Sequence, residues 1–158
     1  MAAPQTLTLD LPEAEATARL GRSLAQLLRP GDTVLLHGPI GAGKSHLARA
    51  LIRARLGRME DVPSPTFTLV QTYPDTAGDI WHADLYRLTH VDEMAELGLE
   101  AAFDSGIALI EWPDRLGTLE PAAALHLRLS AKDEGRRATL SGGRDGLLAA
   151  LSAEWANA

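Results

Sequence analysis

The chain contains no cysteine, which excludes disulfide bonds and thiolate ligands for a metal. It has no apolar run that approaches the roughly 20 residues needed to span a bilayer. Residues 1–11 lack the basic stretch and the unbroken apolar run of a signal peptide. We therefore expect a cytoplasmic protein that does not bind a membrane.

Positive charge is scarce as well, since the net charge is −6 and the pI is near 5.3. A protein that grips a nucleic-acid backbone directly usually carries a basic patch. The longest basic cluster here is Arg49, Arg53, Arg55 and Arg58, and a solvated helix face is its simplest explanation. Direct binding of nucleic acid by this chain alone is therefore not expected.

The most informative segment that is present is Gly38–Ser45, which reads G-P-I-G-A-G-K-S and matches the phosphate-binding loop G-x4-G-K-S. It follows the apolar run 34–36 and precedes a helical pattern, which is the context the motif requires. The glycines let backbone N–H groups curl around a phosphate, and the following helix directs its positive end at the same anion. The residues expected to bind nucleotide are Gly38, Gly41, Ala42, Gly43, Lys44, Ser45 and His46, with the Ser45 hydroxyl also a ligand for Mg²⁺.

Lysine is nearly absent, because Lys44 and Lys132 are the only lysines among 15 basic residues. One of the two stands at the loop position where a flexible point charge differs in kind from the planar fork of arginine. This favours a nucleotide site over a glycine-rich turn with an incidental lysine.

Strand and helix patterns alternate along the 158 residues, which we expect to form a single domain spanning 1–158. Together with the loop, the alternation predicts an α/β P-loop NTPase fold, a three-layer sandwich with a central, mostly parallel sheet and antiparallel additions. The predicted strands are 6–11, 33–37, 67–73, 79–86, 107–110, 125–130 and 136–141, and the predicted helices are 12–29, 44–56, 92–103 and 145–155.

Two carboxylates end predicted buried strands. Glu111 follows the apolar run 107–110, and Asp84 follows the more polar run 80–83. Hydrolysis needs one group to hold Mg²⁺ and another to polarise the attacking water, and this pair could divide these tasks. The residues alone leave open which does which, and either could instead be a solvent-facing or turn-capping residue.

Two further positions have two interpretations each. Thr66 lies in S-P-T-F, where P-loop switch proteins sense the γ-phosphate, although a proline-stiffened start of a strand explains the segment equally well. Trp112 stacks on the nucleotide or a partner, or else packs in the core or at its rim. The five histidines show no metal-ligand spacing, so His46 and His82 taken alone are structural.

Five segments, taken in order, resemble one family. They are H-G-P-I-G-A-G-K-S (37–45), P-S-P-T-F-T-L-V (63–70), H-A-D-L-Y-R-L (82–88), E-L-G-L-E (96–100) and I-E-W-P (110–113). Over about residues 6–141 the chain is similar to the small bacterial ATPases of the TsaE (YjeE) family. The resemblance implies an ATP- and Mg²⁺-dependent hydrolase that is weak alone. It also implies work with the partners TsaD and TsaB, which modify an adenosine beside the tRNA anticodon, so tRNA is reached only through that complex.

The resemblance also implies roles for single residues. Lys44 would bind phosphates, and Ser45 and Asp84 would hold Mg²⁺. Glu111 would activate water or sense the γ-phosphate, and could also be a ligand of the metal. Thr66 would belong to a switch-like catalytic segment, and Trp112 would lie near the nucleotide.

The chain departs from the family pattern in two positions of the loop. Pro39 stands where the family usually has an acidic or polar residue, and His46 replaces a common threonine. Pro39 has no N–H to offer a phosphate, so we expect altered affinity with binding retained.

A small-molecule kinase is the alternative interpretation of the loop. Such a kinase needs an acceptor pocket and usually an arginine-bearing lid. Beyond the loop only Arg87 and Arg115 lie near predicted strand ends, and no insertion is long enough for a lid. A third interpretation, a nucleotide switch without hydrolysis, leaves Asp84 and Glu111 without a purpose.

Overall fold

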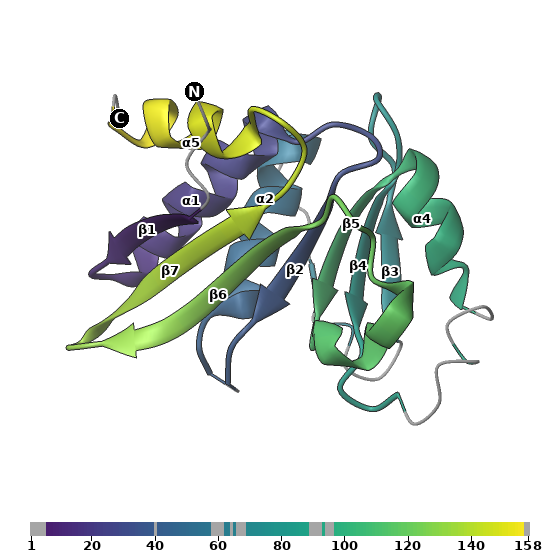
Figure 1. The fold of residues 1–158 in the computed structure, drawn as a ribbon, viewed down its shortest axis with the longest axis horizontal. Helices are drawn as coiled ribbons and strands as arrows, with labels where there is room; N and C mark the ends of the chain where they lie inside the picture. The colour runs from purple at the N-terminus through teal and green to yellow at the C-terminus, as the bar shows by residue number, and fades with distance from the viewer. Residues whose placement is uncertain are drawn as a thin grey trace.

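The computed structural model describes residues 6–39, 41–57, 62–63, 65, 69–88, 93 and 97–156. Within them the strands form one seven-stranded sheet in the order β1-β7-β6-β2-β5-β4-β3 (Figure 1). The strands are β1 (Thr6–Leu11), β2 (Thr33–His37), β3 (Val70–Tyr73), β4 (Ile80–Asp84), β5 (Ile107–Glu111), β6 (Leu125–Lys132) and β7 (Gly135–Gly142). The helices are α1 (Ala14–Leu27), α2 (Lys44–Leu56), α4 (Leu99–Ser105), the 3₁₀ helix η1 (Pro113–Leu119) and α5 (Leu147–Ala156).

The centre of the sheet is parallel and its margins are antiparallel. Strand β2 pairs in parallel with β5 and β6, and β5 pairs in parallel with β4. Strands β1, β7 and β6 are joined antiparallel on one side, and β3 joins β4 antiparallel on the other. The predicted fold class is therefore confirmed.

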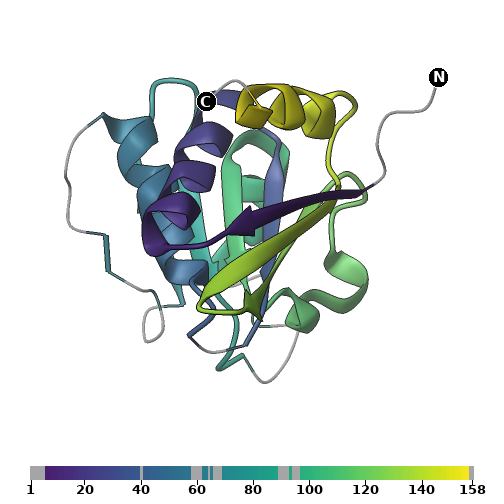
Figure 2. The same cartoon turned by 90° about the vertical axis from the view of Figure 1, so that its left-hand side faces the viewer.

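Side chains of the central strands point alternately into two hydrophobic cores, one on each face of the sheet. The sheet is therefore the middle layer between two layers of helices. Val34 and Leu36 of β2 pack with α1 and α2, while Leu35 packs on the opposite side with α4 and η1. Strand β5 alternates in the same way, and its five residues are all buried. Figure 2 shows α1 (purple) and α2 (blue) together on one side of the sheet and η1 (light green) on the other.

The helix that follows the loop has the predicted bounds, Lys44–Leu56. Gly43 precedes it in the left-handed conformation, and Gly57 ends it the same way with its N–H bonded to Arg53 O at 2.9 Å. Helix α1 is shorter than the predicted 12–29, because Leu28, two residues before Pro30, already has an extended backbone with a ψ of 145°. The Asp32 carboxylate then accepts the Arg29 N–H at 2.8 Å.

Other predicted bounds were less accurate. The terminal hairpin pairs as far as Lys132 and Gly135, so its turn is two residues rather than four. Strand β4 ends at Asp84, short of residue 86, and η1 was not predicted at all. Helix α4 begins after Gly98, which has a φ of +76°. Residues 66–68, 89–92 and 94–96, on which parts of the predicted 67–73 strand and 92–103 helix fall, lie outside the described residues.

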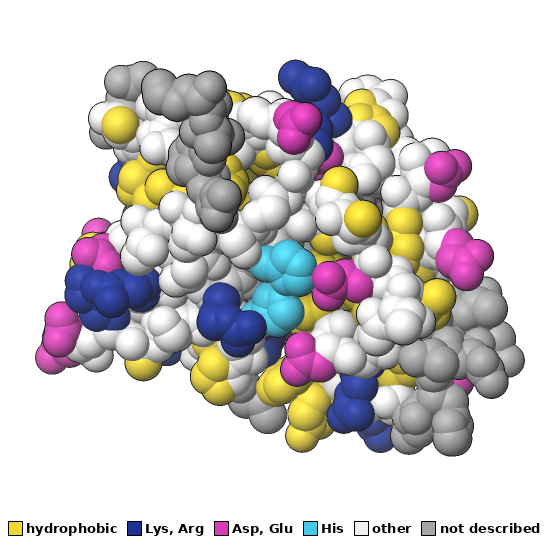
Figure 3. All heavy atoms as spheres, viewed as in Figure 1, with side chains coloured by type: hydrophobic (Ala, Val, Ile, Leu, Met, Phe, Trp, Pro, Cys, Tyr) yellow, Lys and Arg dark blue, Asp and Glu magenta, His cyan; other side chains and the backbone are white. Residues whose placement is uncertain are grey.

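A pair of histidines connects the end of β2 to β6 and η1. His37 Nε2 and His126 Nδ1 lie 3.0 Å apart, and the other ring nitrogens are 3.8 Å from Asp114 and 3.3 Å from Glu120. Figure 3 shows histidine side chains gathered at the centre of this face between acidic and basic groups. Burial lowers the pKa of His37, and the positive charge of Arg128 lowers it further. The cluster lies where η1 adjoins the strand that leads into the loop.

Helix α1 supports α2 through a close contact at Gly21. A Cβ there would lie 2.7 Å from Leu47 O and 3.1 Å from Leu51 N. Among the described residues no helix is both long and apolar enough to cross a membrane.

We predict that Gly21→Ala destabilises the protein. Helix propensity alone would favour alanine by about 1 kcal/mol. The clash with the backbone of α2 costs about 1–3 kcal/mol, as overpacking does in cores, so the net change should be unfavourable. Urea unfolding followed by circular dichroism measures it, and a gain in the free energy of unfolding would contradict the close contact.

Candidate functional site

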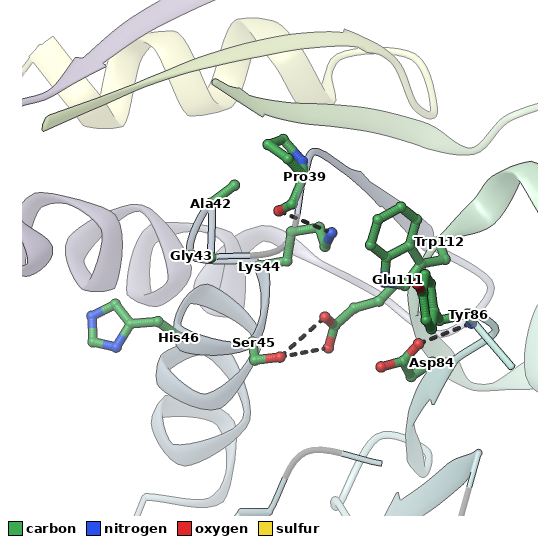
Figure 4. A pocket seen from close by; sticks show the side chains of 11 residues that line it. Pro39, Ala42, Gly43, Lys44, Ser45, His46, Asp84, Tyr86, Glu111 and Trp112 are labelled. Atoms are coloured by element: carbon green, nitrogen blue, oxygen red, sulfur yellow. Dashed lines mark hydrogen bonds between the residues drawn. The ribbon is translucent and has the colours of Figure 1, made fainter. Parts of the chain in front are cut away.

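The carboxyl ends of the parallel strands β2, β5 and β4 meet at one edge of the sheet, where ligands bind in open α/β sheets. The loop leaves β2 there, and Asp84 and Glu111 are direct register partners at the ends of β4 and β5. A cavity of about 450 Å³ opens at this edge (Figure 4). It is lined by Pro39, Gly41, Ala42, Gly43, Lys44, Ser45, His46, Asp84, Tyr86, Glu111 and Trp112.

The loop depends on glycine at positions where other residues would not fit. Gly38 has a φ of +145°, and a Cβ on it would lie 2.6 Å from Leu129 O. Gly41 and Gly43 have φ values of +83° and +103°, a conformation that glycine adopts without a steric penalty. The loop thus turns sharply between β2 and α2 and sets the positive end of α2 at the cavity.

Lys44 lies at the inner edge of the loop. Its ammonium donates to Gly38 O and, at 3.4 Å, to Pro39 O, and it lies 3.8 Å from the centre of the Trp112 ring. Burial lowers the pKa of Lys44, whereas the negative charges of Glu111 and Asp84 raise it. Lys44 as a residue is 5% exposed, although its ammonium lies at the wall of the cavity.

Glu111 is held from two directions. The Ser45 hydroxyl, on α2, reaches its two carboxylate oxygens at 3.0 and 3.1 Å. From β4, His82 Nε2 donates to Oε2 at 2.7 Å. Glu111 is 3% exposed and His82 is 1% exposed. A buried carboxylate needs such partners, because unpaired burial of its charge is costly.

His82 is therefore part of the site, although the residues alone suggested a structural histidine. Its Nδ1 is buried and has no hydrogen-bond partner in the described part of the chain. A hydrogen on Nε2 matches the contact with the carboxylate oxygen. Strand alternation could have indicated the role, because His82 and Asp84 share one face of β4.

Asp84 and two aromatic rings complete the cavity. The Asp84 carboxylate accepts the Tyr86 N–H at 3.0 Å. The Tyr86 and Trp112 rings lie 4.9 Å apart at their centroids. Trp112 has a φ of +58°, which is uncommon for a residue with a side chain. Trp112 therefore lies at the cavity, beside Lys44, rather than in either hydrophobic core, and Tyr86 is a lining residue that sequence reasoning missed.

The remaining expected residues have different placements. Gly38 does not line the cavity, and its carbonyl accepts a hydrogen bond from the Lys44 ammonium. His46 lines the cavity, but its Nε2 points to Ala14 O at 3.1 Å. Thr66 lies outside the described residues.

The donor set suits Mg²⁺. Two buried carboxylates face a single ammonium, and with the Ser45 hydroxyl they offer the hard oxygen ligands that Mg²⁺ prefers. Where the chain is described, no three His, Asp or Glu side chains converge to hold a metal by themselves. Ser45 and a carboxylate of this pair would thus hold the ion only with help from phosphate oxygens, as is usual for Mg²⁺.

Fold and site together define the class as a P-loop NTPase domain. A solved structure, that of Bacillus subtilus YdiB, has the same fold with a TM-score of 0.76, at 23% identity, over 99% of this chain and 98% of that one. The family described as Threonylcarbamoyl adenosine biosynthesis protein TsaE matches residues 11–139. The chain belongs to the TsaE family, which takes part in the biosynthesis of threonylcarbamoyladenosine in tRNA.

Curated relatives agree along most of the chain. The tRNA threonylcarbamoyladenosine biosynthesis protein TsaE of Rickettsia felis is 40% identical over 82% of this chain and 75% of its own. The proteins of the same description from Streptomyces coelicolor and Haemophilus influenzae are 37% and 32% identical, over 88% and 86% of this chain and 93% and 89% of their own. The resemblance expected from the motifs is thereby confirmed.

We predict that His82 and Glu111 are energetically coupled. In a double-mutant cycle with His82→Phe and Glu111→Gln, the coupling should be about 1–3 kcal/mol, because the first change alone removes a partner of a buried charge. Unfolding in urea gives the four free energies. His126→Phe paired with Glu111→Gln is the matched control and should be additive. If the His82 cycle were additive as well, His82 would not be a partner of the Glu111 carboxylate.

Proposed function

We propose that this chain is the ATP-hydrolysing subunit of a machine that makes threonylcarbamoyladenosine in tRNA. The observation that carries the proposal is the contact between the loop and the sheet, with Ser45 Oγ 3.0 Å from Glu111. It joins a phosphate-binding loop to a strand-end carboxylate, which are the two parts that phosphoryl transfer to water requires.

Each side chain has a task that follows from its position. The N–H groups of the loop and the Lys44 ammonium would bind the phosphates and offset the charge that develops on them. When bound, Mg²⁺ would neutralise phosphate oxygens and so favour departure of the terminal group. Trp112 and Tyr86 would border the nucleotide. The family resemblance, rather than a position in the structure, assigns Thr66 to a segment that senses the γ-phosphate.

We assign the carboxylates by their contacts. Glu111 touches the Ser45 hydroxyl, so it would lie beside the metal together with Ser45. Asp84 faces the same cavity from the neighbouring strand and would hold the attacking water or a water on the metal. The family resemblance instead implied that Asp84 holds Mg²⁺ with Ser45 and that Glu111 mainly activates water or senses the γ-phosphate.

TsaD and TsaB are the partners in this proposal. The net charge of −6 supports a subunit that reaches tRNA through other chains rather than by itself. Weak turnover alone and stimulation by the complex would follow if the partners complete the catalytic site. The setting would be the cytoplasm.

The first test is ATP hydrolysis by the purified chain, alone and with a TsaD–TsaB complex and tRNA. We expect little turnover alone and strong stimulation by the complex. Lys44→Ala should reduce turnover to background, because it removes the positive charge at the phosphates, while Lys132→Ala, which changes the only other lysine, should match the unaltered chain. Phosphoryl transfer to a small acceptor with no response to the complex would replace this proposal with a kinase.

A second test separates the two carboxylates. ADP affinity is measured by calorimetry with EDTA and with Mg²⁺, for Glu111→Gln, Asp84→Asn and the control Glu120→Gln. Glu111→Gln should keep the Mg²⁺-free affinity, lose most of the gain that Mg²⁺ provides, and lose hydrolysis. Asp84→Asn should keep that gain and lose turnover. The opposite pattern would make Asp84 the residue beside the metal.

A further inference from the structure

Arg136 reaches the phosphate-binding loop from a distant part of the chain. It stands on β7, on the strand face that also carries the buried Ala138 and Leu140. Its guanidinium donates from Nη2 to Gly41 O at 3.0 Å and from Nε to Ala42 O at 3.2 Å. These are the carbonyls of two successive residues of the loop, 94 and 95 positions away in sequence.

The contact determines where the N–H groups of the loop point. In a trans peptide the C=O and the following N–H point in opposite directions, and no described peptide bond is cis. Holding the carbonyls of Gly41 and Ala42 from outside therefore aims the N–H groups of Ala42 and Gly43 inward. The Ala42 N–H points across the loop and bonds to Pro39 O at 3.1 Å, a bond that it would exchange for one to a phosphate oxygen.

Arginine suits this task for two reasons. Its planar fork presents several N–H donors at fixed spacing, so it can meet two neighbouring carbonyls at once. Its positive charge also lies at the oxygen end of each peptide dipole, which strengthens the N–H donors at the other end. A third donor, Nη1, bonds to Gly135 O at 3.0 Å and fixes the direction of the guanidinium.

The backbone that carries Arg136 is itself well anchored. Strand β7 lies between β1 and β6, and Arg136 is in register with Leu11 on one side and Ala131 on the other. The preceding Gly135 packs so closely that a Cβ would lie 2.5 Å from Leu11 O. The guanidinium thus extends from a fixed point on the sheet.

We propose that Arg136 is a positioning residue of the nucleotide site, which holds the loop with its N–H donors turned toward the phosphates. The inference rests on the proposed nucleotide-binding function and adds a residue from the terminal hairpin to it. Arg136 does not touch the substrate in this assignment, since it acts through the peptide units of residues 41–43.

Arg137 provides a matched control. It is the next residue on β7, projects to the opposite face of the sheet, and pairs with Asp10 at 3.3 Å. Loss of either arginine changes the net charge equally, so a difference between the two variants reports the loop contact rather than charge.

The experiment compares Arg136→Met, Arg136→Lys, Arg137→Met and Lys44→Ala with the unaltered chain. Calorimetry gives the dissociation constant for ADP, and NMR gives the backbone amide signals of Ala42 and Gly43 without nucleotide. Arg136→Met should weaken ADP binding about tenfold, as loss of charge-assisted hydrogen bonds does, and shift both amide signals. Arg136→Lys should be intermediate because one ammonium cannot span both carbonyls, and Arg137→Met should change neither readout.

The outcomes separate this inference from the proposed function. If the unaltered chain binds ADP and Lys44→Ala does not, while Arg136→Met behaves like Arg137→Met, the positioning role is overturned and the nucleotide site stands. If Arg136→Lys bound ADP as tightly as the unaltered chain, the role would not require that both carbonyls be held at once. Failure of the unaltered chain to bind ADP would remove the proposed function, and the inference with it. The NMR readout tests the contact between Arg136 and the loop without any ligand: the Ala42 and Gly43 signals should shift in Arg136→Met and not in Arg137→Met.

Discussion

The hydrogen bonds that converge on Glu111 bring together three separate elements at the functional edge of the sheet. Ser45 comes from α2, His82 from β4 and Glu111 from β5, and the carboxylate they share is almost fully buried. A charge in that position is tolerated only while its partners remain, since desolvation is costly. The same contacts that make the burial possible therefore set the distance between the phosphate-binding loop and the carboxylates at the strand ends.

The loop is constrained from both sides. On the inside, Lys44 bonds to the carbonyls of Gly38 and Pro39 and lies against Trp112. On the outside, the Arg136 guanidinium bonds to the carbonyls of the next two described residues, Gly41 and Ala42. A loop held in this way loses less conformational freedom when a phosphate binds, which is the physical meaning of preorganisation.

Much of the fold could be predicted from pattern alone. The strand 33–37, the loop and the helix 44–56 all lie as expected, because apolar runs, glycines and a C-terminal Gly57 act locally. The prediction was weaker where local patterns compete with packing. Helix α1 ends early beside Pro30, and η1 forms after Trp112, where Leu116 is buried in the second core. Nothing in the residues 113–119 by themselves indicated a helix.

The sequence by itself determined the class of site, since G-x4-G-K-S binds phosphate through groups that are neighbours in the chain. It also indicated that Asp84 and Glu111 end buried strands, but not which carboxylate contacts Ser45. Tertiary structure alone decided that Glu111 does, that His82 supports it, and that Arg136 holds the loop. The reason is distance along the chain: these contacts join residues 29 to 95 positions apart, and only strand order and register bring them together.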